Sequence, residues 1–259
     1  MIRLTYVLRR KPEMSRAEFQ KYWRENHGPL VASHAHSMNL LRYVQVHTLE
    51  DATRQTDGPR GAMEEPYDGV AELWWNSRDD LVSGLDTTKG QAALQEALED
   101  EAKFIDLPNS PLWLAYEYPQ INPSPENLVA TELSSLVKLH YPLRHLPSLS
   151  LDEAQLYWRT AHGPVIRGNG AAGNIKRYIQ VHRFEDELED AMREARGTVA
   201  EPYTGHAELW FDRATRSPAS ATPETIRGGQ LAVEDESKFI DFSRSVTFLA
   251  KEWVFVDNR

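Results

Sequence analysis

The sequence contains no cysteine and no long apolar run, and it has fewer basic than acidic residues. Without cysteine the chain can form no disulfide, thiolate nucleophile, cysteine–zinc site or iron–sulfur cluster. No apolar stretch approaches the roughly 18–20 residues that span a bilayer, and residues 1–11 read as a strand rather than a signal peptide. Twenty-nine Lys and Arg against 39 Asp and Glu give a formal net charge of −10, which disfavours nucleic acids and anionic membranes as partners. These absences predict a cytoplasmic protein whose chemistry depends on His, Tyr, carboxylate, Lys and Arg side chains.

An internal repeat dominates the 259 residues that are present. The segment Tyr22–Pro29 (YWRENHGP) returns as Tyr157–Pro164 (YWRTAHGP), 135 residues later. Further blocks recur in the same order with a slip of at most one residue: 42–47 with 177–182, 65–74 with 201–210, and 100–106 with 235–241. Such ordered repetition indicates a duplicated domain. We expect one unit over residues 1–120, a proline-rich linker over 121–134 and a second unit over 135–259.

Each half shows the pattern strand, helix, strand, strand, helix, strand. The predicted strands are 2–8, 41–48, 69–75 and 112–118, and then 136–143, 175–183, 205–211 and 247–255. Ser15 and Ser150 each precede a Glu by three residues, a capping box that begins a helix, and both helices are predicted to end near the Gly-Pro pairs at 28–29 and 163–164. The charged loops 50–66 and 185–202 are long enough to form mobile flaps.

This element order predicts an α+β fold of two ferredoxin-like βαββαβ units. Each unit would carry both helices on one face of a four-stranded antiparallel sheet and leave the other face bare. Two such sheets in one chain can cover each other. The sequence therefore predicts that the antiparallel sheets pair into a pseudo-twofold α/β-barrel with its helices outside.

The repeated helix ends in a histidine that is a candidate for acid–base chemistry. Helical periodicity places Trp23 and His27 on one apolar stripe, and Trp158 and His162 on the equivalent stripe. Near a helix C-terminus the dipole favours the imidazolium and burial opposes it, so the pKa can be tuned around neutrality, as a general acid–base group requires. The alternative is a buried histidine that fixes the Gly-Pro turn. Retention in both halves fits either role.

Four motifs give the sequence a family resemblance. They are Tyr-Trp-x-x-x-His-Gly-Pro, Arg-Tyr-x-Gln-x-His, Pro-Tyr-x-Gly-x-Ala-Glu-Leu-Trp and Asp-Glu-x-Lys-Phe-Ile-Asp. With them the chain resembles the EthD family of the dimeric α/β-barrel superfamily, in two copies that cover nearly all of it. The resemblance implies paired ferredoxin-like units and an apolar pocket for an aromatic or polyketide-like substrate. Superfamily relatives include cofactor-independent oxygenases, cyclases, dehydratases, decarboxylases and lactone isomerases. The family resemblance also implies a functional role for the helix histidines, His27 and His162.

Charged residues inside the predicted strands form a second constellation. Glu72 and Glu208 lie mid-strand among apolar neighbours, where a carboxylate needs a partner. Arg3 and Lys138 lie on the neighbouring strands, so structural Arg3–Glu72 and Lys138–Glu208 ion pairs are the favoured interpretation. The alternative is a site carboxylate that orients a histidine.

The second half has two histidines that the first half lacks. His140 replaces Thr5 and His206 replaces Val70, so the second half can gather His140, His206 and Glu208 on one sheet face. If that face is covered by the helices, His162 joins them. Such a cluster also fits a metal site, but its spacing is not a known ligand motif, and neither a metal nor another cofactor is predicted.

The resulting hypothesis is a cofactor-free lyase or isomerase that acts on a hydrophobic, aromatic or polyketide-like small molecule by histidine acid–base catalysis. The alternatives are a cofactor-independent monooxygenase and a non-catalytic protein that binds or delivers a hydrophobic metabolite. A homodimer of fused barrels is a further possibility. The candidate catalytic residues are His162, His140, His206, Glu208 and His27, and the candidate substrate-binding residues are Trp158, Tyr141, Tyr178, Gln180, His182 and Trp23.

Overall fold

The structure, a computed structural model, describes residues 1–123, 128–216 and 220–259. The first half contains β1 (Ile2–Leu8), α1 (Arg16–Tyr22), η1 (Trp23–His27), α2 (Gly28–Ser33), β2 (Arg42–Thr48), β3 (Gly69–Trp75), α3 (Arg78–Leu85), α4 (Thr88–Glu101), η2 (Leu107–Asn109) and β4 (Leu112–Ile121). The second half contains β5 (Leu136–His145), α5 (Leu151–Tyr157), η3 (Trp158–His162), α6 (Gly163–Asn169), β6 (Arg177–Arg183), α7 (Glu187–Arg196), β7 (Gly205–Asp212), η4 (Arg213–Arg216), α8 (Pro223–Glu236), β8 (Ile240–Asp241), η6 (Phe242–Arg244) and β9 (Phe248–Asp257). The short elements η1 and η3 are π-helical turns.

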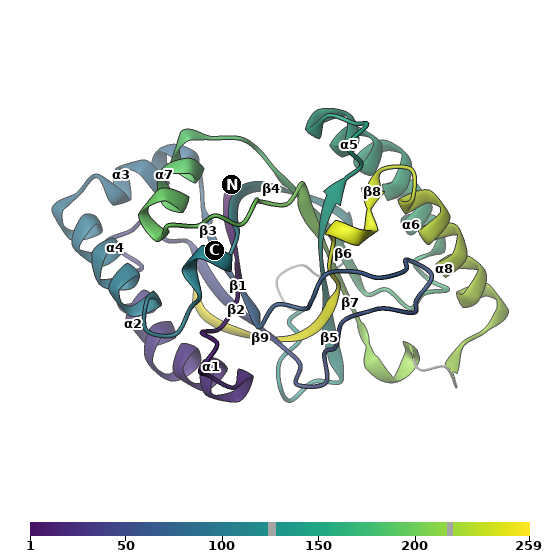
Figure 1. The fold of residues 1–259 in the computed structure, drawn as a ribbon, viewed down its shortest axis with the longest axis horizontal. Coiled ribbons are helices and arrows are strands. Elements are labelled where there is room, and N and C mark those ends of the chain that lie inside the picture. The colour runs from purple at the N-terminus through teal and green to yellow at the C-terminus, as the bar shows by residue number, and fades with distance from the viewer. Residues whose placement is uncertain (124–127, 217–219) are drawn as a thin grey trace.

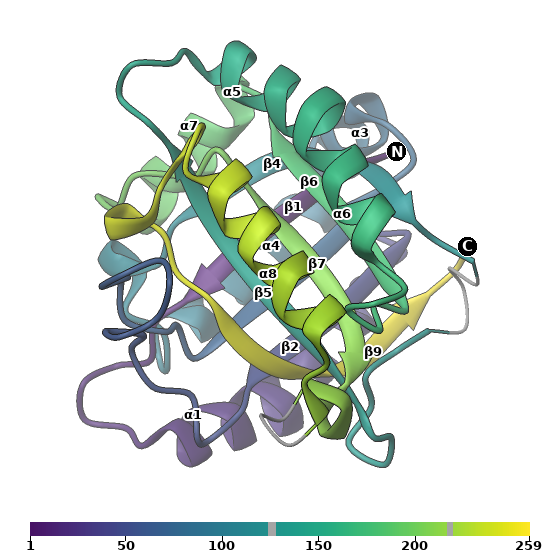
Figure 2. The ribbon, with the colours of Figure 1, turned by 90° about the vertical axis from the view of Figure 1, so that its right-hand side faces the viewer.

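The long strands close into one antiparallel barrel in the order β1-β3-β2-β9-β5-β7-β6-β4, with β4 pairing back to β1. The halves join where β2 pairs with β9 and where β4 pairs with β6. Figure 1 shows the barrel between two groups of helices, and Figure 2 shows α6 and α8 lying across the strands of the second half. The α+β barrel predicted from the sequence is therefore confirmed. Within the described residues, no helix combines the length and apolar character needed to cross a membrane.

The first helix of each half does not end at the Gly-Pro pair, contrary to the prediction. It starts at the predicted capping box, with the Ser15 side chain accepting from the Glu18 N–H, and then continues through η1 into α2. The N–H of Gly28 donates to the carbonyl of Trp23, five residues back, which widens the turn. A proline ring clashes with the carbonyl four residues earlier in a regular α-helix, and the widened turn gives Pro29 room. The second half repeats this arrangement at Gly163.

The two long loops cross between the halves rather than covering their own half. Residues 185–202, predicted as a loop, contain α7, because Asp186 caps its first turn and Gly197 ends it at φ 63°. Met192 of α7 packs against the first-half core, while Met63, from the loop 50–66, is buried in the second-half core. In Figure 1 α7 lies beside α3 and α4, and the dark blue loop lies over the second half. Each half is thus covered by a segment of the other.

The last strand of the first half is longer than the predicted 112–118. Strand β4 continues to Ile121, so Pro119 lies inside it, at a point where the register with β6 shifts and a missing N–H is tolerated. Residues 124–127 of the predicted linker 121–134 lie outside the described residues. Strand β5 begins at Leu136.

Candidate active site

Each half holds a histidine–aspartate pair at the end of its π-helical turn. Nδ1 of His162 lies 2.9 Å from Oδ2 of Asp235 in α8, and Nδ1 of His27 lies 2.9 Å from Oδ2 of Asp100 in α4. Both histidines are buried. The turn from η3 into α6 points the imidazole at the last turn of α8, so the widened helix positions the pair.

The surroundings of Asp235 fix the state of the pair. Tyr157 donates its hydroxyl to Oδ1 at 2.7 Å, and Lys238 donates from Nζ at 3.1 Å. Burial raises the pKa of Asp235, but the hydrogen bonds from Tyr157, Lys238 and His162 outweigh it and hold that pKa below its usual value. A carboxylate only accepts, so Nδ1 of His162 is the donor in this hydrogen bond. No described residue makes a hydrogen bond to Nε2, which leaves this nitrogen free to contact a ligand.

His162 opens onto a cavity of about 440 Å³ between the sheet and the helices of the second half. This volume lies within the usual range for small-molecule sites. Three of the predicted substrate-binding residues, Tyr141, Trp158 and Tyr178, line it. The rest of the wall is largely aliphatic, including Leu139, Ile166, Leu209, Val233 and Ile240.

The other two predicted binding residues of this half lie behind the cavity wall. Gln180 donates from Nε2 to the Trp158 carbonyl at 2.9 Å and to the Tyr178 hydroxyl at 3.1 Å. The His182 ring stacks on Trp158 with centroids 4.5 Å apart, and its Nε2 lies 3.1 Å from Oε1 of Gln180. Neither side chain lines the cavity, so both hold Trp158 and Tyr178 in place rather than facing a ligand.

The equivalent cavity of the first half is about 70 Å³, room for only a few water molecules. Trp23 and His27 line it as predicted, together with Leu81 and Leu85 of α3 and Met192 of α7. These side chains fill the space that stays open in the second half. The dyad is thus present twice, but it faces a sizeable cavity only once.

A further pair of charged residues at each site escaped prediction. Arg60, from the crossing loop, donates from Nε and Nη2 to both carboxylate oxygens of Glu236, at 2.6 and 2.8 Å. Arg196 of α7 binds Glu101 in the same way, at 2.7 and 2.9 Å. The signal was present in the sequence: Arg60-Gly61 and Arg196-Gly197 share the one-residue slip of the Glu-Pro-Tyr block that follows them. Glu101 and Glu236 each directly follow the aspartate of the dyad.

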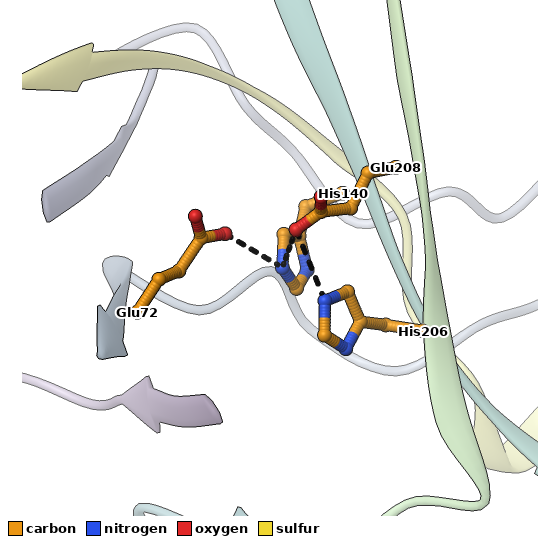
Figure 3. A group of neighbouring side chains, drawn as sticks. All are labelled: Glu72, His140, His206 and Glu208. Carbon is orange, nitrogen blue, oxygen red and sulfur yellow. Dashed lines mark hydrogen bonds and ion pairs between the residues drawn. The ribbon is translucent and has the colours of Figure 1, made fainter. Parts of the chain in front are cut away.

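His140, His206 and Glu208 do not join His162, contrary to the arrangement considered from the sequence. Side chains alternate along a strand, and Tyr141 and Ala207 face the helices and line the cavity. Their neighbours His140 and His206 therefore face the barrel interior, where Figure 3 shows them with Glu72 and Glu208. Burial lowers the pKa of His206 to about 3.

The same interior cluster contains the predicted ion pairs. Arg3 lies 2.7 Å from Glu72, and Lys138 lies 2.9 Å from Glu208. Each cation also binds the other carboxylate, Arg3 to Glu208 at 2.5 Å and Lys138 to Glu72 at 2.6 Å. Burial acts to raise the pKa of Glu208, but Arg3 and Lys138 hold it well below its usual value. The predicted ion pairs are confirmed, and Arg3 also contacts Glu117 while Lys138 also contacts Glu252, so the network joins two cations and four carboxylates.

The cluster contains side chains of the types that bind metal ions. One ligand atom from each of Glu72, His140, His206 and Glu208 lies within 4.8 Å of the others. The Oε1 atoms of both glutamates, however, already contact Arg3 and Lys138. A metal ion there would lie beside two fixed positive charges, which does not fit a divalent cation. We assign the cluster to the barrel core.

Comparisons with known proteins bear on the fold and the family. Among solved structures, an anthrone oxidase-like protein aligns with 100% of this chain and 94% of its own, at 8% identity and a TM-score of 0.58. A monooxygenase candidate from Fusobacterium nucleatum aligns with 98% of this chain and 93% of its own, at 4% identity and a TM-score of 0.52. At these identities the likeness shows a shared fold.

An EthD family protein from Bacillus halodurans is 22% identical over 46% of this chain and 99% of its own, with a TM-score of 0.29. A search of curated proteins finds no match. The family model of the EthD domain matches residues 11–108 and again residues 146–243. These two matches cover most of the sequence, and the chain therefore belongs to the EthD family, with two copies of the domain.

Proposed function

We propose that this protein is an acid–base catalyst that moves protons on a small, apolar, ring-containing molecule held in the second-half cavity. The observation that carries the proposal is His162, which binds Asp235 through Nδ1 and opens onto about 440 Å³ of space. The reaction would be that of a lyase or an isomerase: dehydration, decarboxylation, cyclisation or a double-bond shift. The apolar wall of the second-half cavity would take an aromatic or polyketide-like substrate.

The side chains suffice for such a transfer. Nε2 of His162 takes a proton from a substrate carbon, and the electron pair of that C–H bond moves into the substrate. Asp235 stabilises the imidazolium that forms, because its carboxylate lies against Nδ1. Return of the proton to another carbon gives an isomer, and its delivery to a departing hydroxyl releases water.

A cofactor-independent monooxygenase is a second candidate, because the same base would generate the carbanion that reacts with molecular oxygen. The names of two solved structures with this fold mention an anthrone oxidase-like protein and a monooxygenase, which supports this second candidate. Oxygen uptake during turnover separates this reaction from the lyase and isomerase reactions, which consume none.

Proton abstraction can be tested with 2-tetralone, a bicyclic ketone with acidic C–H bonds beside its carbonyl. Binding is measured by ligand-observed NMR, and exchange of the C1 protons is followed in D₂O. We expect the wild type to bind the probe and accelerate exchange, and His162→Ala to lose about 10²–10⁴-fold of the acceleration while still binding. His27→Ala should retain exchange, because the first-half cavity is too small for two rings.

Each outcome of this experiment has one meaning. Exchange by His162→Ala at the wild-type rate, or absence of probe binding, contradicts the proposal. Binding without any exchange identifies a binding or delivery protein instead. Exchange accompanied by oxygen consumption supports the monooxygenase. Circular dichroism of each variant shows whether a loss of exchange is a loss of fold.

The duplication itself supports a finer description of the fold. The strands of the first half lie in the order β4-β1-β3-β2, and those of the second half lie in the equivalent order β9-β5-β7-β6. We infer that each half is a ferredoxin-like unit, and that the barrel is the pairing of two such sheets.

A further inference from the structure

Arg60 reaches the second-half cavity from the first half of the chain. Two of its guanidinium nitrogens, Nε and Nη2, are held by Glu236, which directly follows the dyad residue Asp235 in α8. The third nitrogen, Nη1, makes no hydrogen bond with any described residue. A bidentate carboxylate therefore fixes the plane of the guanidinium and leaves one edge for another acceptor. Arg60 and Glu236 both line the cavity.

Tyr141 supplies a second donor beside Arg60. The guanidinium carbon of Arg60 lies 5.4 Å from the centre of the Tyr141 ring, and Tyr141 also lines the cavity. Its hydroxyl is buried and has no partner in full hydrogen-bond geometry among the described residues, although the neighbouring Arg60 guanidinium acts to lower its pKa. Burial raises the pKa of Tyr141 well above its usual value, so the hydroxyl keeps its proton. An unpaired buried donor costs free energy unless a ligand accepts from it.

We propose that Tyr141 and Arg60 bind the carbonyl oxygen of the substrate, so that the site takes a ring compound with an enolisable carbonyl group. This rests on the proposed role of His162 as the base. His162 removes a proton from the carbon next to the carbonyl, the C–H pair forms a carbon–carbon double bond, and the carbonyl π pair moves onto oxygen. The enolate oxygen then accepts from the Tyr141 hydroxyl and from Nη1 of Arg60. Return of the proton at a different carbon completes an isomerisation.

The charge balance of the site favours this role over capture of an anion. Arg60 and Glu236 form a neutral pair, so the cavity presents donors without a net positive charge. Such donors stabilise negative charge as it develops on an oxygen more than they stabilise the neutral ketone. A pre-ionised carboxylate ligand would instead meet the nearby charges of Glu236 and Asp235.

The test compares Tyr141→Phe with its first-half counterpart Tyr6→Phe. The hydroxyl of Tyr6 is likewise buried beside an arginine, Arg196, without a partner in full hydrogen-bond geometry among the described residues, but its cavity is about 70 Å³. We expect Tyr141→Phe to slow exchange of bound 2-tetralone by about 10²-fold and to weaken its binding by less than about tenfold. Binding of tetralin, which has the same rings and no carbonyl, should be unchanged. Tyr6→Phe should alter none of these values.

Arg60→Lys, with Arg196→Lys as its control, tests the second donor. The lysine keeps the ion pair with Glu236 but lacks the fixed fork, so exchange should fall while urea unfolding changes little. Removing the unpaired hydroxyl in Tyr141→Phe should leave the unfolding midpoint equal or higher. A Tyr141→Phe variant that exchanges at the wild-type rate overturns this inference and leaves the role of His162 intact. An active His162→Ala variant overturns both.

Discussion

Acid is expected to weaken this fold through histidines that are buried in their neutral form, and His182 is one of them. Its side chain is 2% exposed, its Nε2 lies 3.1 Å from Oε1 of Gln180, and its Nδ1 has no partner among the described residues. Burial, with smaller contributions from Arg159 and His206, lowers the pKa of His182 to about 3. A proton on Nδ1 would be buried without an acceptor. The native state therefore keeps the ring neutral.

The sign and size of the effect follow from this pKa. A histidine in the unfolded chain titrates at about 6.5, so between about pH 6.5 and pH 3 the unfolded chain binds a proton that the native state does not. The free energy of unfolding therefore falls as the pH falls through this window. Each pH unit below 6.5 costs about 1.4 kcal/mol, which gives about 2 kcal/mol at pH 5. Burial also lowers the pKa of His47, its first-half equivalent, to about 3, so the two together cost about 4 kcal/mol.

The variant that measures this is His182→Gln, which keeps a side-chain N–H donor and cannot titrate. Urea unfolding, followed by tryptophan fluorescence at pH 7.5 and pH 5.0, gives the free energy of unfolding at each pH. At pH 7.5 the variant should be less stable by about 1 kcal/mol, since the stacking on Trp158 is lost. Between pH 7.5 and pH 5.0 it should lose about 2 kcal/mol less than the wild type.

The exposed His36 provides the control, because His36→Gln should leave the difference between the two pH values unchanged. If His182→Gln loses as much stability in acid as the wild type, His182 accepts a proton in the native state. Burial would then not be enough to keep the His182 ring neutral.

Three further substitutions separate the roles of the dyad, the crossing helix and the barrel interior. Asp235→Asn should slow 2-tetralone exchange by about 10²-fold or more, because an amide no longer selects the tautomer of His162. NMR in D₂O measures the exchange rate. An unchanged rate would remove Asp235 from the mechanism. Met192→Ala should enlarge the first-half cavity and raise the stoichiometry of 2-tetralone binding from one toward two. Calorimetry measures this stoichiometry. A stoichiometry that stays at one would show that α7 is not what closes the first-half cavity. Arg3→Met should lower the free energy of unfolding, measured in urea, by about 3–5 kcal/mol, because Glu208 loses a buried partner. A loss below about 1 kcal/mol would mean that the ion pairs of Arg3 do not stabilise the barrel interior.

Local signals in the sequence predicted the strands and the helix starts well, because each of these signals depends on only a few neighbouring residues. The predicted strands 2–8 and 69–75 coincide with β1 and β3, and Ser15 and Ser150 cap α1 and α5 as expected. The passage of each helix through Gly-Pro was missed, because proline breaks a regular α-helix and only the widened turn accommodates it. Nothing in a linear pattern distinguishes that turn from a helix end.

The candidate site was only partly predictable, because both faces of the barrel strands are buried. Strand β1 is buried at all seven positions, so apolar alternation does not mark which face meets the helices. This is why His140 and His206 could be placed on one face, but not on the correct side of the sheet relative to His162. Arg60 reaches Glu236 because the loop 50–66 passes from the first half to the second half, and no local motif encodes that path.

The two halves hold the same dyad in different surroundings. His27 and Asp100 have the same contacts as His162 and Asp235, so each pair ties its π-helical turn to the helix opposite, whether or not a ligand can reach it. This shared contact accounts for retention of the histidine in both copies, so retention does not by itself indicate catalysis. The difference lies in the covering segments: α3 and α7 fill the first cavity, whereas the loop 50–66 leaves the second open. In the duplicated chain, each half is covered by a segment of the other half. One copy can therefore keep a closed core while the other copy keeps a cavity.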